Sequence, residues 1–284
     1  MKILYIADYF AHDHNLGGGE LNDKELLFLL SEKGCDIEAK ETRHTNRDFL
    51  IQPHIKGRTL IVSNFLHLSK DTISFIIDNF KYIIYEHDHK YLKSRNPAEF
   101  EKCLVPKEKI INYEFYKNAT AIVCQSTFHE NIIKKNLQLD NIYSVGGNLW
   151  SEETLDFLLE RSKKEKKDKC SIMNSTVEHK NTEEAVRYCL YKKMDYELIN
   201  RSSYLHFLKQ LSANKKLVFF PKTPETLCRV IVEARMMGMI VITNSAVGAT
   251  KEGWFELKGE PLVDLMRQKR FDISDKIMEF LRGK

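Results

Sequence analysis

The feature that most constrains this 284-residue chain is a regular alternation of short apolar runs with longer amphipathic segments. Residues 2–7 (KILYIA) have no polar face, which is typical of a parallel strand buried on both sides. A loop with three consecutive glycines follows, and leucines at helical spacing then predict a helix over residues 20–33 that Gly34 ends. Strand, glycine loop and helix in this order are typical of a nucleotide-binding α/β unit.

The alternation continues and then restarts near residue 150, which predicts two successive βαβ series. In the first series we expect strands at 59–64, 81–85, 119–124 and 141–145, and helices at 70–79, 107–118 and 127–136. In the second we expect helices at 152–166, 182–192 (with Asn181 as N-cap), 226–237 and 273–281, and strands at 170–174, 217–220 and 240–243. The chain is therefore expected to form two Rossmann-like parallel-sheet domains facing a cleft, over 1–148 and 149–284.

Composition narrows the class of protein. Hydrophobic residues make up 43% and charged residues 30%, an ordinary globular balance that excludes disordered and low-complexity chains. No apolar run approaches the roughly 18 residues of a spanning helix, and Asp8 interrupts an N-terminal stretch too short for a signal peptide. We therefore expect no transmembrane segment and a cytoplasmic location, with peripheral membrane association left open.

Charge and cysteine content exclude two further classes. The net charge is +4, and residues 160–169 (ERSKKEKKDK) alone hold six Lys or Arg and three Asp or Glu, so the run carries +3 of it. Such a run predicts a solvated helix end or a charged linker region rather than a phosphate-binding face. The six cysteines have no C-x-x-C spacing, which predicts reduced packing residues and not a zinc ribbon or a disulfide framework.

The strongest functional motif lies in residues 219–252, where Glu225 and Glu233 are eight residues apart. On a single ideal helix they would stand about 80° and about 12 Å apart, too far to grip one atom together. With Glu225 in the loop before a helix and Glu233 in its second turn, they can instead contact two parts of one elongated ligand. The helix N-terminus between them would then face a phosphate.

This segment resembles the E-x7-E signature of retaining glycosyltransferases with the GT-B fold, of the family 4 type. The strand and proline before Glu225, the E-A-x-x-x-G run from Glu233 and the G-x-x-x-E turn from Gly248 to Glu252 all fit the resemblance. The resemblance implies that Glu225 contacts the hydroxyls of the donor sugar and that Glu233 holds the ribose of the nucleotide. Where that family commonly has E-G-x-G, this chain has Glu-Thr-Leu-Cys, with Thr226 directly after the first glutamate.

Three weaker motifs appear in the order expected from the resemblance. Lys180, in K-N-x-x-x-A, would neutralise the donor diphosphate, which a compact ammonium suits. The usual upstream base is missing, and Arg229 or Lys222 would replace it. Gly18 and Gly19 belong to a G-G-x-E loop whose backbone N–H groups can reach an anion.

The fourth motif is the H-D element at the end of strand 81–85. It places His87 at the reaction centre, with Asp88 as its orienting partner, because an imidazole donates hydrogen bonds and exchanges protons near neutral pH. We therefore expect His87, Asp88 and Glu225 to be catalytic residues. The expected donor-binding residues are Gly18, Gly19, Lys180, Glu225, Thr226, Arg229 and Glu233.

The expected reaction moves a sugar from a nucleoside diphosphate sugar to an acceptor hydroxyl with retention of configuration, without a metal or other cofactor. The C-terminal domain would bind the donor, UDP- or GDP-linked, and the N-terminal domain the acceptor. That acceptor would be a glycan, a lipid-linked sugar or a small molecule in preference to a nucleic acid.

Three alternatives stay open at this point. A glucosyltransferase acting on modified bases of nucleic acid shares the implied fold, and a non-catalytic nucleotide-sugar-binding subunit would explain the missing E-G-x-G glycines. A metal-dependent hydrolase could use the triplets 12–14 and 87–89, both His-Asp-His at expected strand ends, because such clusters are metal ligands.

Overall fold

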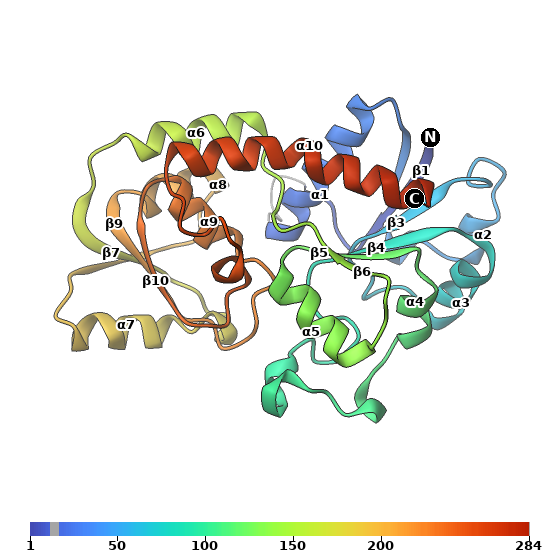
Figure 1. Ribbon diagram of the computed structural model, residues 1–284, viewed down its shortest axis with the longest axis horizontal. Helices are drawn as coiled ribbons and strands as arrows, with labels where there is room; N and C mark the ends of the chain where they lie inside the picture. Colours follow the sequence, from blue (N-terminus) through green and yellow to red (C-terminus); the bar gives the residue numbers. More distant parts are fainter. Residues whose placement is uncertain (12–16, 284) are drawn as a thin grey trace. The chain divides into compact units, whose positions relative to one another are not determined.

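The computed structural model describes residues 1–11 and 17–283, and the chain divides into two units, each with its own parallel sheet (Figure 1). Unit 1 comprises Met1–Leu149 and the C-terminal residues from Arg270 onward, and unit 2 comprises Trp150–Lys269. The long helix α10 (Glu260–Arg282) therefore begins in unit 2 and ends in unit 1. The predicted α/β class with two parallel sheets is confirmed.

Unit 1 contains a six-stranded sheet in the order β2-β1-β3-β4-β5-β6, with every pairing parallel. The first strand in the chain thus lies inside the sheet, between the second and third, as its apolar sequence predicts. The strands are β1 (Lys2–Ala7), β2 (Asp36–Glu41), β3 (Thr59–Val62), β4 (Tyr82–Glu86), β5 (Ala121–Cys124) and β6 (Ile142–Ser144).

Side chains of β1 alternate between two hydrophobic clusters, one on each face of the sheet. Leu4 and Ile6 belong to the first cluster, while Ile3 and Tyr5 belong to the second, which also contains leucines of α1 and apolar residues of the last turns of α10. The helices of unit 1 are α1 (Gly18–Glu32), α2 (Arg47–Leu50), α3 (Lys70–Asn79), α4 (Tyr113–Asn118) and α5 (Thr127–Leu137).

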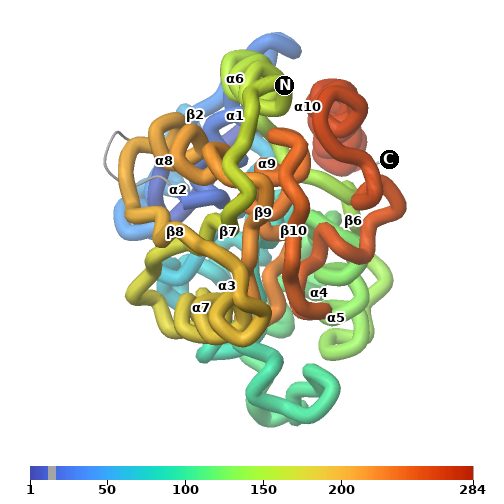
Figure 2. Tube along the Cα trace, turned by 90° about the vertical axis from the view of Figure 1, so that its left-hand side faces the viewer, coloured from blue at the N-terminus to red at the C-terminus, as the bar shows by residue number. Residues whose placement is uncertain are grey.

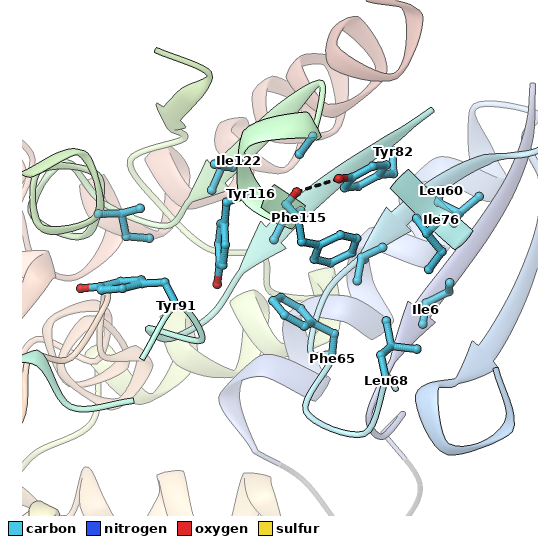
Figure 3. Packing of buried hydrophobic residues seen from close by; sticks show 14 of the residues in the cluster. Ile6, Leu60, Phe65, Leu68, Ile76, Tyr82, Tyr91, Phe115, Tyr116 and Ile122 are labelled. Atoms are coloured by element: carbon cyan, nitrogen blue, oxygen red, sulfur yellow. Dashed lines mark hydrogen bonds between the residues drawn. The ribbon is translucent and has the colours of Figure 1, made fainter. Parts of the chain in front are cut away.

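Aromatic side chains fill the first of these clusters (Figure 3). The rings of Tyr82 and Phe115 stack with centroids 4.8 Å apart, and the Tyr82 hydroxyl donates to the Phe115 carbonyl at 2.7 Å. Phe65 meets the Phe115 ring edge-on at 5.2 Å. The short helix α4 is therefore held on the sheet by ring packing and a buried hydrogen bond together.

Unit 2 contains a four-stranded parallel sheet in the order β10-β9-β7-β8, which Figure 2 shows strand by strand. Helix α7 packs on one face through a cluster that includes Cys170, Cys189 and Val218, and α6, α8 and α9 pack on the other. The elements are β7 (Lys167–Met173), β8 (Tyr196–Ile199), β9 (Asn214–Phe219), β10 (Ile240–Thr243), α6 (Glu152–Ser162), α7 (Thr182–Tyr191), α8 (Tyr204–Leu211) and α9 (Arg229–Met236).

Within unit 2, α6 lies beside the first turns of α10 (Figure 1). Arg267 of α10 donates to Glu152 and to Asp156 of α6, each at 2.8 Å. These exposed ion pairs contribute little stability one by one, and their value is to set the register of the two helices.

The structure corrects several predicted helix boundaries. The predicted helix 107–118 is wrong over its first half: a single 3₁₀ turn covers Lys107–Lys109, and α4 begins only at Tyr113 because Asn112 has a φ of 58°. The helix predicted to begin at residue 226 begins at Arg229. Asn181 precedes α7 as predicted, but its side chain does not cap that helix and donates instead to the Phe220 carbonyl at 2.9 Å.

Three other predictions from the sequence concern the charged run, the cysteines and membrane-spanning helices. Residues 160–169 comprise the end of α6, a short connection and the first residues of β7. All six cysteines are free, and five of them are buried, as expected for packing residues. Within residues 1–11 and 17–283, no helix combines the length and the apolar character needed to cross a membrane.

Candidate functional site

The residues predicted to bind a nucleotide sugar gather in unit 2 after the carboxyl ends of two adjacent strands. Lys180 ends a 3₁₀ turn after β7, and Glu225 lies in the loop after β9. Their side chains form an ion pair, with Lys180 Nζ 2.7 Å from Glu225 Oε1. Both residues therefore lie at the carboxyl ends of neighbouring parallel strands, which is where parallel sheets bind their ligands.

The loop that carries Glu225 is fixed through its backbone. The Glu225 N–H donates to the Ala246 carbonyl at 2.8 Å, and the Glu225 carbonyl accepts from the Gly248 N–H at 2.9 Å. The G-x-x-x-E turn predicted around Gly248 therefore holds the first glutamate of the E-x7-E motif in place. Its side chain is partly exposed, so it can exchange its partner without unfolding the loop.

Lys180 stays charged in this environment. Burial alone would lower its pKa, but the Glu225 carboxylate outweighs that effect and the pKa of Lys180 is raised. A protonated ammonium at a strand end, held by one carboxylate, is suited to an anionic ligand that replaces this carboxylate.

Helix α9 begins next to this pair with an unusual residue. Cys228, its N-cap, has a φ of 74°, in the left-handed region that favours glycine. Cys228 occupies the second glycine position of the E-G-x-G pattern, and its backbone adopts a conformation that glycine adopts most easily. Thr226, predicted as the first residue of this helix, lies in the preceding loop and is buried.

Glu233 lies in the second turn of α9, as predicted, and is 3% exposed. Its Oε1 accepts from Trp150 Nε1 at 2.9 Å and from the Tyr204 hydroxyl at 2.6 Å. Arg229 Nε also donates to it, at 3.3 Å, and the guanidinium stacks over the Trp150 ring at 4.4 Å. Trp150 and Tyr204 are functional candidates that sequence reasoning missed, because neither belongs to a motif.

The two bases considered as replacements for the missing upstream cation differ in their surroundings. Arg229 is held by Glu233 and Trp150 and is mostly buried. Lys222 is exposed and pairs with Glu178 at 3.0 Å. Arg229 is thus a fixed cation next to the α9 N-terminus, whereas Lys222 is an ordinary surface lysine.

In unit 1, Gly17 is the N-cap of α1, and Gly18 and Gly19 are its first residues. A Cβ atom at Gly19 would come within 3.6 Å of the His87 ring and 3.5 Å of the Asn64 amide. These are ordinary contact distances, and they show that the first turn of α1 lies against the residues that follow β3 and β4.

His87 is brought together with partners that differ from the one predicted. Its Nε2 lies 2.8 Å from Asp23 Oδ1, and its Nδ1 lies 2.6 Å from Gln125 Nε2. The carboxylate of Asp88, expected to orient His87, instead binds Lys90 and Arg95, each at 3.0 Å. Asp23 is hard to recognise from sequence because a polar residue on a helix usually faces solvent.

A second buried polar cluster surrounds Lys90. This side chain and Glu86 are both fully buried and form an ion pair, and the Tyr116 hydroxyl also donates to Glu86. Burial alone would lower the pKa of Lys90, but Asp88 and Glu86 raise it, so the lysine stays protonated.

The neighbouring His89 is buried, and burial lowers its pKa to about 4. Neither of its ring nitrogens has a hydrogen-bond partner among the described residues. His89 is therefore neutral near pH 7 and packs as part of the support for the loop after β4.

The predicted metal alternative involves two triplets. His12-Asp13-His14 lies outside the described residues, and in the second triplet the three side chains point to different partners. In the described part of the chain, no three His, Cys, Asp or Glu residues are grouped so that they could hold a metal ion.

Comparison with known proteins identifies the fold. No protein-family model matches the chain, and no curated protein sequence matches it. Among solved structures, the catalytic domain of starch synthase IV from Arabidopsis thaliana, bound to ADP and acarbose, matches with a TM-score of 0.57 at 10% identity, covering 99% of this chain and 94% of that one.

Two further structures match over the whole chain. Anabaena HepE, in complex with UDP and glucose, gives a TM-score of 0.51 at 12% identity, covering 100% of this chain and 92% of that one. An alpha-glucosyltransferase, in complex with UDP and a 13-mer DNA, gives 0.52 at 11% identity, with coverages of 100% and 93%. The chain therefore has the GT-B glycosyltransferase fold that the sequence motifs predict.

Proposed function

We propose that this protein is a retaining GT-B hexosyltransferase that moves a sugar from a nucleoside diphosphate sugar to an acceptor hydroxyl. The fold supports this class, because similar structures contain UDP with glucose or ADP. The observation that carries the proposal is the Lys180–Glu225 pair beside the N-terminus of α9, at the carboxyl ends of β7 and β9. An ammonium and a helix N-terminus together suit a diphosphate.

The Lys180–Glu225 ion pair leads us to propose the following order of events in donor binding. The donor diphosphate replaces Glu225 as the partner of Lys180, and Glu225 becomes available to the sugar hydroxyls. When the bond to the anomeric carbon breaks, the diphosphate gains negative charge, which Lys180 and the α9 N-terminus stabilise without moving.

The remaining residues have supporting roles in the proposal. Glu233 accepts hydrogen bonds from the ribose, in a position already set by Trp150, Tyr204 and Arg229. Further proposed donor contacts come from Gly18, Gly19, Thr226 and Arg229, and a catalytic role is proposed for His87. The carboxylate of Asp88, which binds Lys90 and Arg95, is not proposed to orient it. We propose UDP or GDP as the nucleotide and a reaction independent of metal.

A thermal-shift screen is the first test. Purified protein is titrated with UDP, GDP, ADP and CDP and their common sugar conjugates, with divalent metal or with EDTA. The proposal expects one nucleoside diphosphate to raise the melting temperature, equally in EDTA. No shift with any nucleotide, together with a fall in melting temperature in EDTA, would contradict it and favour the metal-dependent hydrolase.

The reaction itself is tested with the donor that binds. Release of nucleoside diphosphate in the presence of glycan, lipid-linked sugar or small-molecule acceptors identifies a transferase. The anomeric proton of the product, followed by NMR, distinguishes retention from inversion. Tight nucleotide binding with no turnover of any acceptor would instead support a non-catalytic binding subunit.

Nucleic acid is a second acceptor candidate, because one structural neighbour is an alpha-glucosyltransferase bound to DNA. The lysines of residues 160–169 are the sequence feature that favours it, although Lys164, Lys167 and Lys169 have acidic partners within unit 2. DNA binding that weakens steeply with salt, together with glucosylation of modified bases, would support this acceptor.

A further inference from the structure

Four buried side chains from four elements of unit 1 form one continuous hydrogen-bonded chain. Ser63, directly after β3, donates from Oγ to Asp23 Oδ2 at 2.6 Å. Asp23 Oδ1 meets His87 Nε2 at 2.8 Å, and the Gln125 amide meets His87 Nδ1 at 2.6 Å. His87 follows β4 and Gln125 follows β5, so three members end neighbouring strands of the sheet, and Asp23 reaches them from α1.

One face of α1 is shaped to hold this imidazole. Gly19 and Asp23 are four residues apart, which places them on the same side of the helix, one turn from each other. Gly19 lies against the ring, where a Cβ atom would make an ordinary van der Waals contact at 3.6 Å, and Asp23 binds its Nε2. The first turn of α1 and the acid one turn later thus both face His87.

This series of hydrogen bonds determines which ring nitrogen of His87 carries a hydrogen. The Asp23 carboxylate is 1% exposed and only accepts hydrogen bonds, so Nε2 of His87 must donate to it. The basic nitrogen of the neutral ring is then Nδ1, which accepts from the Gln125 amide.

Among residues 1–11 and 17–283, two tyrosines are further titratable groups that lie close to the pair. Burial and the charge of Asp23 raise the pKa of Tyr5 on β1, so this phenol stays neutral. Tyr85 on β4 packs against the ring of His87 with centroids 5.0 Å apart. The Asp23 carboxylate lies directly against His87 and can balance a positive charge on its ring.

We infer that Asp23 is a positioning residue of the transfer reaction: it holds His87 as the Nε2–H tautomer and makes Nδ1 the atom that receives the acceptor's proton. This inference rests on the proposed glycosyl transfer. For this transfer the acceptor hydroxyl takes the place of the Gln125 amide at Nδ1. Asp23 itself touches no substrate.

The proton and electrons balance in this step. The acceptor O–H bond breaks and its proton moves to Nδ1, while the oxygen's electron pair forms the bond to the anomeric carbon on the same face that the diphosphate leaves, so that the configuration is retained. The bond from that carbon to the diphosphate breaks, and its electron pair leaves with the diphosphate. The Asp23 carboxylate stabilises the imidazolium until the ring returns its proton to water.

The test compares Asp23→Asn with Glu25→Gln in the full chain. Glu25 is also a buried acid of α1, but it pairs with Arg270 and has no contact with His87 in the hydrogen bonds described. Asp23→Asn is expected to lower kcat at least about tenfold, with donor KM little changed, and to move the acidic limb of the pH–rate profile to lower pH. Glu25→Gln is expected to lower the melting temperature with kcat and the pH profile unchanged.

An NMR measurement tests the inference without activity. The ¹⁵N spectrum of wild-type protein with labelled histidine is expected to show His87 as the Nε2–H tautomer, identified by its loss in His87→Gln. Hydrogen on Nδ1 in that spectrum, or a wild-type kcat and pH profile in Asp23→Asn, would overturn it. If wild-type protein transfers no sugar, the proposed function fails, and the spectrum still decides the tautomer.

Discussion

Two charged clusters, one in each unit, differ in how deeply they are buried. In unit 1, Asp23 and His87 are 1% and 6% exposed, and Lys90 and Glu86 are not exposed at all. In unit 2, Lys180 and Glu225 are 29% and 16% exposed, although they form an equally short ion pair. Burial thus separates a set of groups that are fixed in the fold from a pair that a ligand can open.

The physical reason is the cost of removing charge from water. A buried pair that loses one partner leaves an uncompensated charge, so its partners are needed for folding. A partly exposed pair is screened by solvent and contributes little stability, so either partner is available for a ligand. The comparison therefore predicts a larger loss of stability when the Lys90–Glu86 pair is broken than when the Lys180–Glu225 pair is broken.

The largest loss of stability is expected for Lys90→Met, which tests the buried cluster directly. Methionine fills a similar volume but leaves Glu86 and Asp88 without their ammonium, so we expect the free energy of unfolding to fall by about 3–5 kcal/mol. Urea titration measures it, with Lys180→Met as the matched change in unit 2, expected to cost less than about 1 kcal/mol. Equal losses in the two variants would show that burial does not separate the clusters.

A pH titration of stability is the next test. The pKa of His89 is about 4 in the fold against an ordinary 6.5, so the unfolded chain takes up the proton first as pH falls. Stability from this residue is complete above pH 6.5 and is lost down to pH 4, by about 3 kcal/mol. Chemical unfolding at several pH values measures the slope.

Two variants test whether His89 causes this loss of stability at acid pH. His89→Gln should flatten the acid loss of stability, whereas His206→Gln, which replaces an exposed histidine of unit 2, should leave it unchanged. An undiminished slope in His89→Gln would assign the acid sensitivity to other groups. Burial also lowers the pKa of His129, so this neighbour adds a contribution of the same sign.

Lys180→Met tests whether the partly exposed pair of unit 2 binds the donor. We expect affinity for the nucleoside diphosphate to weaken by about 1.5–3 kcal/mol, the value of a hydrogen bond to a charged group. Calorimetric titration measures the affinity, and Lys222→Met, which removes an exposed lysine paired with Glu178, is the control with unchanged affinity. Equal affinities in wild type and Lys180→Met would remove Lys180 from the donor site.

The smallest effect is expected at the start of α9. Cys228 has a φ of 74°, which costs a residue with a Cβ roughly 1–2 kcal/mol relative to glycine. Cys228→Gly and Cys228→Ala both remove the thiol, but only glycine relieves the backbone. We therefore expect the glycine variant to be more stable than the alanine variant by about 1 kcal/mol in urea unfolding, and a more stable alanine variant would contradict the strain.

Sequence patterns predicted the strands that read as apolar runs, including the edge strands β6 and β10, and missed the two polar edge strands β2 and β8. β1, β3, β4 and β5 read as apolar runs because both of their faces pack against helices. β2 (DIEAKE) and β8 (YELI) lie at the ends of their sheets and carry polar residues, so they show no apolar run. The break before α4 was also missed, because Asn112 adopts a left-handed backbone that its sequence does not require.

The candidate site was predictable where a motif fixed the spacing of residues along the chain. The E-x7-E spacing placed Glu225 in a loop and Glu233 in the second turn of a helix, as the structure has them. Partners that come from distant parts of the chain carry no such signal. Asp23 meets His87 across 64 residues, and Trp150 meets Glu233 across 83.

The polar strand that escaped sequence reading also affects how the protein behaves in concentrated solution. β2 is the outermost strand of the six-stranded sheet, and Asp36, Glu38, Lys40 and Glu41 carry charges along it. A strand from another molecule that tried to extend the sheet there would have to desolvate these charges. The features that hide β2 from a hydrophobicity scan therefore protect this edge of the sheet from aggregation.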